Sequence, residues 1–338
     1  LSFVYKCSKE ILKHTKKKKI IITKSTVPVG TGDEIEKIIK NKKKLFSIIS
    51  NPEFLREGEA IRDFRYPDRI VIGSNNKNEF NTMKKLYSPL ISKGAKFFTT
   101  SRRGAELIKY AANAFLATKI TFINELANLC EKSGINVEDV SLGIGSDTRI
   151  GSRFLRAGPA YGGSCFPKDT KGLVSAAEKF KTNLSIVKSV IKSNHERVGL
   201  LTKRVHKILG NNLRNKKIGI LGVTFKPNTD DMRDSTSLKM IPYYCKKGAI
   251  VTYYDPSGEK EEFKKLKNCE FKKNIKDTCK DSDLIILLTE WDEFKSLDFK
   301  KLSKKKNFKV YDLRNLYNPE EMLNKKIEYF SVGRPNTN

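Results

Sequence analysis

The sequence predicts an α/β protein in which two regions with parallel sheets lie on either side of a helical middle. Residues 1–98 and 210–338 alternate strand signals with helical patterns, which is the order expected of βαβ units and a parallel sheet. Residues 101–206 instead show long helical periodicity, rich in Ala and Leu. With 338 residues, the chain is long enough for two or three domains.

The first region starts with Val4, Cys7 and Ile11 on one predicted helical stripe. A second helical pattern occupies residues 31–40. The strand signals of this region are IIIT at 20–23, LFSIIS at 45–50 and RIVIG at 69–73. Apolar strands that alternate with helices in this way predict a parallel sheet.

The middle region contains one long helical pattern at 106–134, with apolar residues on more than one face. A single domain cannot easily bury all of such a helix, so we expect this region to mediate dimerisation. Two further helices are predicted at about 170–181 and 184–208.

The last region returns to strands and helices. Its helix near Ser235 contains Pro242, which predicts a kink. Its strand signals are KKIGILGV at 216–223, AIVTYYD at 249–255, DLIILLT at 283–289 and FKVYDL at 308–313.

The composition indicates a soluble globular chain with a strong basic bias. The 67 Lys and Arg residues outnumber 38 Asp and Glu residues and give a formal net charge of +29. The lysines form short clusters over the whole length without interleaved aromatic residues. We therefore expect no nucleic-acid partner, although a basic chain is one signature of such binding. No signal peptide and no long apolar run occurs, so we expect a cytoplasmic protein with no membrane partner.

The six cysteines form no C-x-x-C pair and match no zinc pattern. We therefore expect free thiols and no metal. Cys165 alone lies among glycines, in AYGGSCFPKD at 160–169. The other five have apolar or helical surroundings and are predicted to be small core residues: Cys7, Cys130, Cys245, Cys269 and Cys279.

The chain lacks the G-x-G-x-x-G fingerprint of a dinucleotide site. The glycines of GILGVTF at 219–225 have the wrong spacing, and the chain begins without methionine. If the protein binds a dinucleotide, we expect its phosphate loop either to be missing or to precede Leu1. In the latter case the chain would be a fragment of a longer protein.

Polar residues follow the strand signals of the first region, where open parallel sheets bind their ligands. Thr26 is placed to hold a substrate or a water, although a hydroxyl-capped turn is the simpler interpretation of this residue alone. Glu53 and Glu57 share one face if their segment is helical; they are candidates for acid–base catalysis or for a surface pair.

Lys109 and Asn113, also four residues apart, lie on an apolar helix. A lysine there must snorkel or meet an anion, and with an amide donor it can stabilise an oxyanion.

Cys165 is the candidate nucleophile. A thiolate is a strong nucleophile, and glycines let a substrate reach the sulfur without a side-chain clash. Lys168 and Asp169 offer a charge partner and a base. A buried thiol beside a tight turn is the alternative, which the surrounding residues make less favourable.

Basic residues also follow the strand signals of the last region, where each is a candidate to meet a phosphate. Surface solvation is the alternative for any one of them. These residues are Lys226, Arg233, Arg314 and Arg334.

Seven motifs occur in order along the chain: KSTVPVGT, NPEFLREG, ELIKYAANAF, GGSCFPKD, FKPNTDDMR, TEWDEF and DLRN. Together they resemble the UDP-glucose/GDP-mannose dehydrogenase family over essentially the whole chain. Phe166, directly after the cysteine, is more typical of bacterial members that oxidise UDP-glucose than of those that oxidise GDP-mannose.

The resemblance implies two Rossmann-like parallel-sheet domains, the first incomplete, joined by a helical central domain. Residues 1–98 would be the C-terminal part of an NAD-binding domain. Residues 99–208 would be the central dimerisation domain with the cysteine loop. Residues 209–338 would bind the UDP-sugar.

The resemblance also implies an NAD-dependent, four-electron oxidation of UDP-glucose at C6 to UDP-glucuronate. Cys165 would trap the intermediate aldehyde as a thiohemiacetal, and a second oxidation would give a thioester that water cleaves. This divides one difficult oxidation into easier steps.

Five more catalytic residues are implied by the resemblance. Lys109 and Asn113 would stabilise the alkoxide. Asp169 and Thr26 would position the water or relay its proton, and Glu57 would assist thioester hydrolysis.

Binding roles are implied in the same way. Arg149 resembles an arginine that reaches the ligand of a neighbouring subunit. We expect a homodimer, built through the helical middle region. The implied substrate contacts are Glu53, Arg149, Phe154, Leu155, Arg156, Tyr161, Gly162, Lys226 and Arg314. The implied NAD contacts are Thr26, Glu57, Lys168 and Arg233.

Three other functions stay open on the sequence alone, of which a basic nucleic-acid binder is the one that the scattered lysines make least favourable. The second is GDP-mannose 6-dehydrogenase, which the motifs separate only weakly. The third is an inactive nucleotide-sugar-binding fragment that lacks the NAD phosphate loop.

Overall fold

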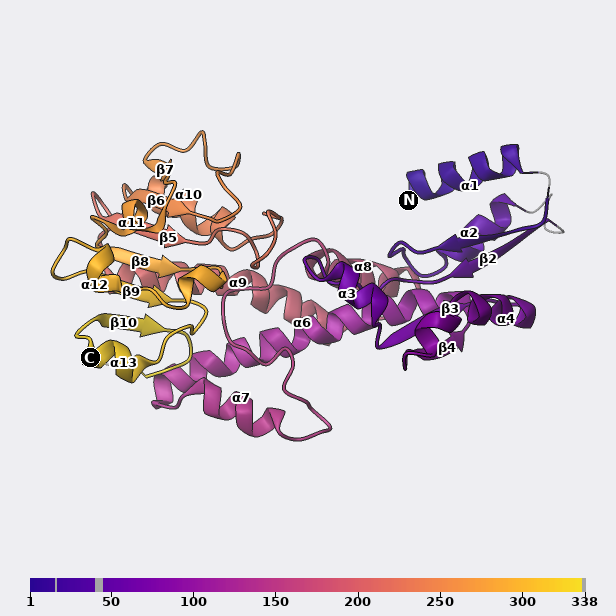
Figure 1. Ribbon diagram of the computed structural model, residues 1–338, viewed down its shortest axis with the longest axis horizontal. Helices are drawn as coiled ribbons and strands as arrows, with labels where there is room; N and C mark the ends of the chain where they lie inside the picture. Colours follow the sequence, from indigo (N-terminus) through magenta and orange to yellow (C-terminus); the bar gives the residue numbers. More distant parts are fainter. Residues whose placement is uncertain (16, 40–44, 336–338) are drawn as a thin grey trace. The chain divides into compact units, whose positions relative to one another are not determined.

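The structure is a computed structural model that describes residues 1–15, 17–39 and 45–335 (Figure 1). The chain divides into two units. The first comprises residues 1–114 and 169–184, and the second comprises residues 115–168 and 185–338. Helices α6 (Arg102–Ser133) and α8 (Phe166–Lys179) each belong in part to both units.

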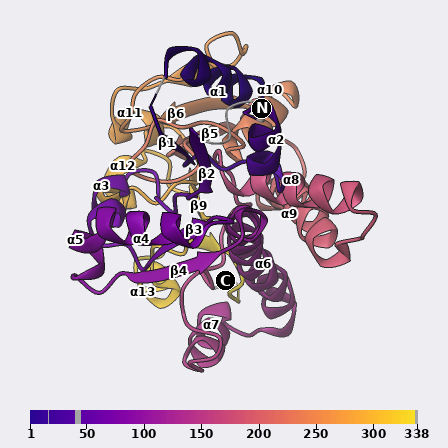
Figure 2. The ribbon, with the colours of Figure 1, turned by 90° about the vertical axis from the view of Figure 1, so that its right-hand side faces the viewer.

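The sheet of the first unit has the strand order β1-β2-β3-β4 (Figure 2). Its strands are β1 (Lys19–Thr23), β2 (Phe46–Ser50), β3 (Arg69–Gly73) and β4 (Lys96–Thr100). Strands β1 and β2 are parallel, as are β3 and β4. A single antiparallel pair, Ser50 opposite Gly73, joins the two halves. The predicted parallel sheet is therefore confirmed within each pair and interrupted between them. Strand β4 escaped the sequence analysis because most of its side chains are exposed.

Helices cover both faces of this sheet. Alternate residues of the strands point to opposite faces, so Ile21 and Ile48 pack with helices α1 and α2, whereas Ile22 and Ile49 pack with α4 and α5. The helices of this unit besides α6 and α8 are α1 (Ser2–His14), α2 (Thr31–Ile38), α3 (Ala60–Arg65), α4 (Lys77–Leu86) and α5 (Ser88–Ile91).

The sheet of the second unit is fully parallel, with the order β10-β9-β8-β5-β6-β7. This is the doubly wound Rossmann order, in which ligands bind beyond the carboxyl ends of the strands at the point where the order reverses, here between β5 and β8. The strands are β5 (Lys217–Leu221), β6 (Ile250–Tyr254), β7 (Cys269–Phe271), β8 (Leu284–Leu287), β9 (Lys309–Asp312) and β10 (Glu328–Ser331).

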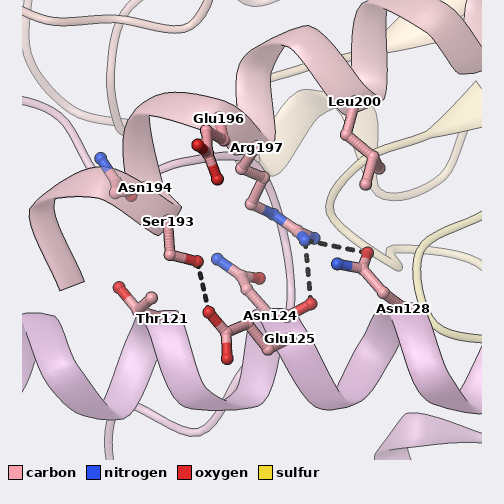
Figure 3. A pocket seen from close by; sticks show the side chains of 9 residues that line it. All are labelled: Thr121, Asn124, Glu125, Asn128, Ser193, Asn194, Glu196, Arg197 and Leu200. Atoms are coloured by element: carbon pink, nitrogen blue, oxygen red, sulfur yellow. Dashed lines mark hydrogen bonds between the residues drawn. The ribbon is translucent and has the colours of Figure 1, made fainter. Parts of the chain in front are cut away.

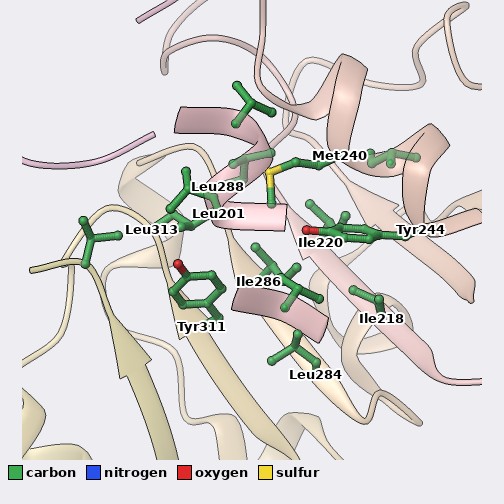
Figure 4. Close-up of a cluster of buried hydrophobic side chains, with 14 of the residues drawn as sticks. Leu201, Ile218, Ile220, Met240, Tyr244, Leu284, Ile286, Leu288, Tyr311 and Leu313 are labelled. Atoms are coloured by element: carbon green, nitrogen blue, oxygen red, sulfur yellow. The ribbon is translucent and has the colours of Figure 1, made fainter. Parts of the chain in front are cut away.

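The core of the second unit lies on both sides of this sheet. Ile218 and Ile220 pack with Leu201 and Tyr244 on the face covered by α9 and α10 (Figure 4). Side chains such as Leu287 fill the other face with α11, η2, α12 and α13. The elements involved are α9 (Ser185–Ile208), α10 (Ser237–Lys246), α11 (Ile275–Cys279), η2 (Asp292–Phe294), α12 (Phe299–Leu302) and α13 (Pro319–Asn324).

The predicted helices of the middle region are confirmed as α6, α8 and α9, and α7 (Val137–Gly145) adds one more. Pro242 lies inside α10, as expected. The prediction that Cys7 is a core residue is wrong, because its thiol is exposed on α1. Within the described residues, we find no helix that is both long and apolar enough to span a bilayer.

Candidate active site

Asn113 and Asp169 form the centre of a polar group in the first unit. Helix α8 approaches α6 closely at Gly172, where a β-carbon would lie 2.7 Å from the Tyr110 ring. This approach allows Asn113 Nδ2 to donate a 2.6 Å hydrogen bond to Asp169 Oδ2, and both side chains are buried. Burial, together with the charges of Asp169 and Glu106, raises the pKa of Tyr110 to about 12.

Lys109 lies one helical turn before Asn113 and is also buried, with 5% of its side chain exposed. A buried ammonium group needs an opposite charge. Its Nζ atom lies 3.8 Å from Glu53 Oε1 and 5.2 Å from the centre of the Phe54 ring. The structure therefore brings Lys109 and Glu53 together, as an ion pair beside an aromatic face.

The segment that carries Glu53 and Glu57 is not helical, so the expected common helical face does not exist. Residues 51–56 have no regular structure, residues 57–59 form a turn, and α3 begins only at Ala60. Pro52 disfavours a helical conformation for the residue before it, and Gly58 has a φ of +79°. Glu53 is half-buried, whereas Glu57 is exposed.

Asn51 is a site residue that the sequence analysis missed, and it organises the carboxyl edge of β1 and β2. Its Nδ2 donates to Val71 O at 2.9 Å, and its Oδ1 accepts from Lys24 Nζ at 3.0 Å and Tyr87 Oη at 2.6 Å. Thr26, in the loop after β1, is half-buried. The signal that could have found Asn51 is an amide placed directly after a buried strand.

The carboxylate of Glu106, a residue of α6, occupies the N-terminus of α2. Helix N-termini are favourable sites for phosphate groups. The Glu106 carboxylate accepts from Gly30 N–H at 2.7 Å, Gly32 N–H at 2.8 Å and Ser50 Oγ at 3.1 Å. Burial raises the pKa of Glu106, while these donors act in the opposite direction. The α2 N-terminus therefore does not fit the pyrophosphate of a dinucleotide. The polar loops after β1 and β2 nevertheless lie at the carboxyl ends of their strands, where open parallel sheets bind such ligands.

Cys165 belongs to the second unit and is exposed, directly before the first residue of α8. Its Sγ atom lies 3.5 Å from Ser164 Oγ. The next residue, Phe166, contacts Phe154 and Tyr161 edge-to-face, with ring centres 6.2 Å and 5.9 Å apart. The thiol is thus accessible while its neighbour anchors the loop.

The two glycines before the cysteine are needed by the protein's own packing. A β-carbon on Gly162 would lie 2.4 Å from Asp234 O, and one on Gly163 would lie 2.6 Å from the Phe225 ring. Gly163 also has a φ of +78° and donates its N–H to Arg233 O at 2.7 Å. The expected role in substrate access is therefore joined by a structural one: the glycines let the cysteine loop pack on residues 225–234.

Arg314 follows β9 at the carboxyl edge of the second sheet. Its Nε donates to Leu288 O at 2.9 Å and its Nη2 to Phe225 O at 3.1 Å. The buried carboxylate of Asp312 accepts from Arg314 N–H at 2.9 Å and fixes the turn. Burial lowers the pKa of Arg314, and the nearby Glu290 opposes this shift.

Arg156 and Lys226 lie at the same edge. Arg156 donates to Arg314 O at 3.0 Å, and its Nη1 lies 3.0 Å from Glu290 Oε2. Lys226 lies over the Phe225 ring at 5.3 Å. Three basic residues and one carboxylate therefore surround the strand ends. Glu290 was missed as a single residue, although it lies in the quoted TEWDEF motif.

The remaining predicted contacts have different environments. Arg233 is held by Asp231 through hydrogen bonds of 2.8 and 2.9 Å. Arg149 is paired with the Asp147 carboxylate in the same way. Lys168 is exposed on α8, whereas Leu155 is buried in the hydrophobic core. Arg334 is buried and donates to Tyr317 O at 2.8 Å, and it borders a cavity of about 1470 Å³ together with residues such as Arg204 and Tyr311.

Three segments match domains of the UDP-glucose/GDP-mannose dehydrogenase family. Residues 1–91 match its NAD binding domain, residues 103–196 its central domain and residues 219–319 its UDP binding domain.

Individual relatives are similar over nearly the whole chain. A UDP-glucose 6-dehydrogenase of Rhizobium meliloti is 46% identical over 340 residues, covering 99% of this chain and 78% of the relative. One of Rickettsia prowazekii is 44% identical over 98% of this chain and 77% of the relative. The structure of a UDP-glucose dehydrogenase from the archaeon Pyrobaculum islandicum matches with a TM-score of 0.87 and 31% identity, over 98% of this chain and 75% of that one.

Proposed function

The chain belongs to the UDP-glucose/GDP-mannose dehydrogenase family, and we propose that it is a UDP-glucose 6-dehydrogenase that uses NAD. The observation that carries the proposal is Cys165, an exposed thiol in a loop built by close glycine packing. The names of the relatives favour UDP-glucose over GDP-mannose as the substrate.

Bound NAD⁺ supplies the hydride acceptor, so that one alcohol, two NAD⁺ and one water give one carboxylate, two NADH and three protons. Cys165 Sγ attacks the C6 aldehyde carbon; a C–S bond forms and the carbonyl π electrons move to oxygen, which gives the thiohemiacetal. Its oxidation leaves a thioester. Water then attacks the thioester carbon, and the C–S bond breaks to release the thiolate.

The polar group of the first unit supplies charge and proton transfer in this proposal. Lys109 donates a hydrogen bond to the alkoxide formed at C6. Because this cation is already buried, it stabilises the negative charge more strongly than a cation in water would. Asn113 supplies the N–H that is not donated to Asp169. Asp169 takes the proton of the attacking water. Thr26 orients that water, and Glu57 assists hydrolysis.

The binding roles follow from the chemistry of each group. Arg156, Lys226 and Arg314 supply positive charge for the diphosphate of the substrate. Other proposed substrate contacts are Glu53, Arg149, Phe154, Leu155, Tyr161 and Gly162. The proposed contacts of NAD are Thr26, Glu57, Lys168 and Arg233.

We also propose that the protein is a homodimer that pairs through α6. Phe115, Phe122 and Leu129 recur at intervals of seven residues on this helix and are 65%, 51% and 61% exposed. Three large apolar side chains on one stripe are costly to leave in water, and a second copy of the same helix would cover them.

The test of the proposed function is the ratio of NADH formed to sugar consumed. We expect two NADH per UDP-glucose and no free aldehyde, with little turnover of GDP-mannose under the same conditions. A ratio of one with release of the aldehyde would overturn the covalent route, and faster oxidation of GDP-mannose would overturn the substrate.

A further inference from the structure

The backbone that leads into the cysteine loop is held by side chains of two helices in the second unit. Residues 158–161 precede the glycines and have no regular secondary structure. Their peptide groups cannot bond to one another as in a helix, so other groups must satisfy them. Three polar side chains from α6 and α9 do this: Asn124, Asn194 and Arg197.

Asn124 and Arg197 hold the first part of the segment. Asn124 Oδ1 accepts from Gly158 N–H at 2.9 Å, and Arg197 Nε donates to Gly158 O at 2.7 Å. Arg197 Nη1 also donates to Asn124 O at 2.9 Å, which ties the two helices together. Both side chains are buried, with 2% and 5% exposed. Arg197 therefore joins α6, α9 and the loop in one network. Figure 3 shows the α6 side of this network, where Arg197 bonds to Asn124 and Asn128.

Asn194 holds the next part of the segment at Tyr161, which lies four residues before Cys165. Its Oδ1 accepts from Tyr161 N–H at 2.9 Å, and its Nδ2 donates to Tyr161 O at 3.0 Å. Such a two-bond contact fixes both the position and the direction of the Tyr161 peptide groups. The Tyr161 ring in turn contacts Phe166, the residue after Cys165.

We propose that Arg197, acting with Asn124 and Asn194, is a positioning residue that sets the orientation of Cys165 for attack on the aldehyde. Arg197 touches neither thiol nor substrate in this proposal; it acts through the backbone of Gly158, while Asn194 holds the backbone of Tyr161. The inference rests on the proposed function, because it assumes that Cys165 is the nucleophile.

The chemistry of Arg197 suits this role. Burial, with a contribution from the Arg204 charge, lowers its pKa to about 10, so the guanidinium stays charged at neutral pH. Within the described residues, its Nη2 has no hydrogen-bond partner. The side chain borders a cavity of about 220 Å³ between α6 and α9, lined mostly by polar groups such as Thr121 and Ser193. Removing the guanidinium would enlarge this space enough to admit a free guanidinium ion.

The experiment compares Arg197→Ala with the matched variant Arg204→Ala. Arg204 lies on the same helix and also bonds to α6, through Glu131 and Asn128. Within the part of the chain that the structure describes, it forms no hydrogen bond with residues 158–161. For Arg197→Ala we expect kcat to fall by about 10²-fold, the loss typical of a displacement near 1 Å, while UDP affinity changes less than threefold. For Arg204→Ala we expect kcat within threefold of the parent.

Two further readouts separate positioning from a merely structural role. Guanidinium at low millimolar concentration should raise the kcat of Arg197→Ala at least tenfold, whereas ethylammonium should leave this kcat unchanged. The rate at which iodoacetamide alkylates Cys165, followed by mass spectrometry, should change in Arg197→Ala and return with guanidinium. If Arg197→Ala fails to fold, Asn194→Ala takes its place, with a tenfold loss of kcat and the same change in alkylation expected.

Unchanged kcat and alkylation in these variants would overturn the positioning role. A loss that guanidinium does not rescue, equal in Arg197→Ala and Arg204→Ala, would also overturn it. Normal turnover by Cys165→Ser would instead overturn the proposed role of Cys165 as the nucleophile, whereas the variants of Arg197 test only its positioning, and the two failures are thus distinguishable.

Discussion

Asn113 donates a 2.6 Å hydrogen bond to Asp169, and both side chains are buried. The bond uses one of the two amide hydrogens and fixes the carboxylate that we propose as the base for thioester hydrolysis. For Asp169→Asn we expect kcat to fall by about 10²- to 10⁴-fold, the usual contribution of a general base. A sugar–enzyme adduct should accumulate on Cys165, and intact-protein mass spectrometry would detect it.

Glu178→Gln is the control for this variant, because Glu178 lies on the same helix and is exposed. It should turn over normally and show no adduct. If Asp169→Asn is slow but carries no adduct, Asp169 acts before the thioester forms, and the assigned role is incorrect.

Cys165→Ser tests the nucleophile directly. A hydroxyl replaces the thiol with little change in volume, but a serine nucleophile needs a base such as histidine, and residues 158–169 contain no histidine. We expect UDP-glucose to bind with unchanged affinity by calorimetry, and NADH formation to fall by at least 10³-fold. Cys7→Ser, at another exposed cysteine, should keep full activity. Normal turnover by Cys165→Ser would mean that the thiol is structural.

Lys226 tests the binding of the diphosphate. It lies 5.3 Å above the Phe225 ring at the carboxyl edge of the second sheet. For Lys226→Met, which keeps the length of the side chain and removes its charge, we expect KM for UDP-glucose to rise about tenfold. This corresponds to ~1.4 kcal/mol of lost binding. The value of kcat should change little, and a loss confined to kcat would assign Lys226 to the chemistry instead.

Assembly can be tested on the apolar stripe of α6. A charge at its centre, in Phe122→Glu, should convert the homodimer to a monomer in sedimentation velocity at micromolar concentration. Leu323→Glu is a fair control, because Leu323 is exposed to the same extent, 51%, on α13. A parent protein that sediments as a monomer would contradict the proposed dimer.

Much of the fold follows from local patterns. The apolar runs at 20–23 and 283–289 became β1 and β8, because continuous apolar strands suit a sheet covered on both faces. The pattern could not reveal the antiparallel pair Ser50–Gly73, since strand direction depends on contacts far apart in sequence. Strand β4 was invisible because its exposed side chains leave no apolar run.

The candidate site was less accessible to sequence reasoning. The spacing of Lys109 and Asn113 predicted a shared helical face, but the approach of α8 that adds Asp169 depends on tertiary packing at Gly172. Glu53 and Glu57 show the reverse error, because their spacing suggests a helix that Pro52 and the turn at Gly58 interrupt. A spacing of four residues places two side chains on one face only where the segment is helical.

Stability should depend on pH through Asp33. Burial alone would raise the pKa of Asp33, but hydrogen bonds from Arg102 and Arg103 outweigh burial and hold the pKa below its usual value of 3.8. Because the folded pKa is the lower one, the ionised carboxylate stabilises the fold above pH 3.8, and this contribution disappears as the pH falls through the folded pKa.

Asp33→Asn measures this contribution. We expect its free energy of unfolding to be lower than that of the parent by about 1.5 to 3 kcal/mol at pH 7, the range for hydrogen bonds to charged groups. Urea unfolding should show the same difference at pH 5, and the difference should shrink as the pH falls below 3.8, because protonation of the parent carboxyl removes its charge. Glu34→Gln removes an exposed ion pair with Lys37 from the same helix, and it should change stability little at any pH because water and salt screen such pairs. A difference between Asp33→Asn and the parent that does not shrink at all as the pH falls below 3.8 would mean that the side chain stabilises the fold by packing, since packing does not depend on the charge.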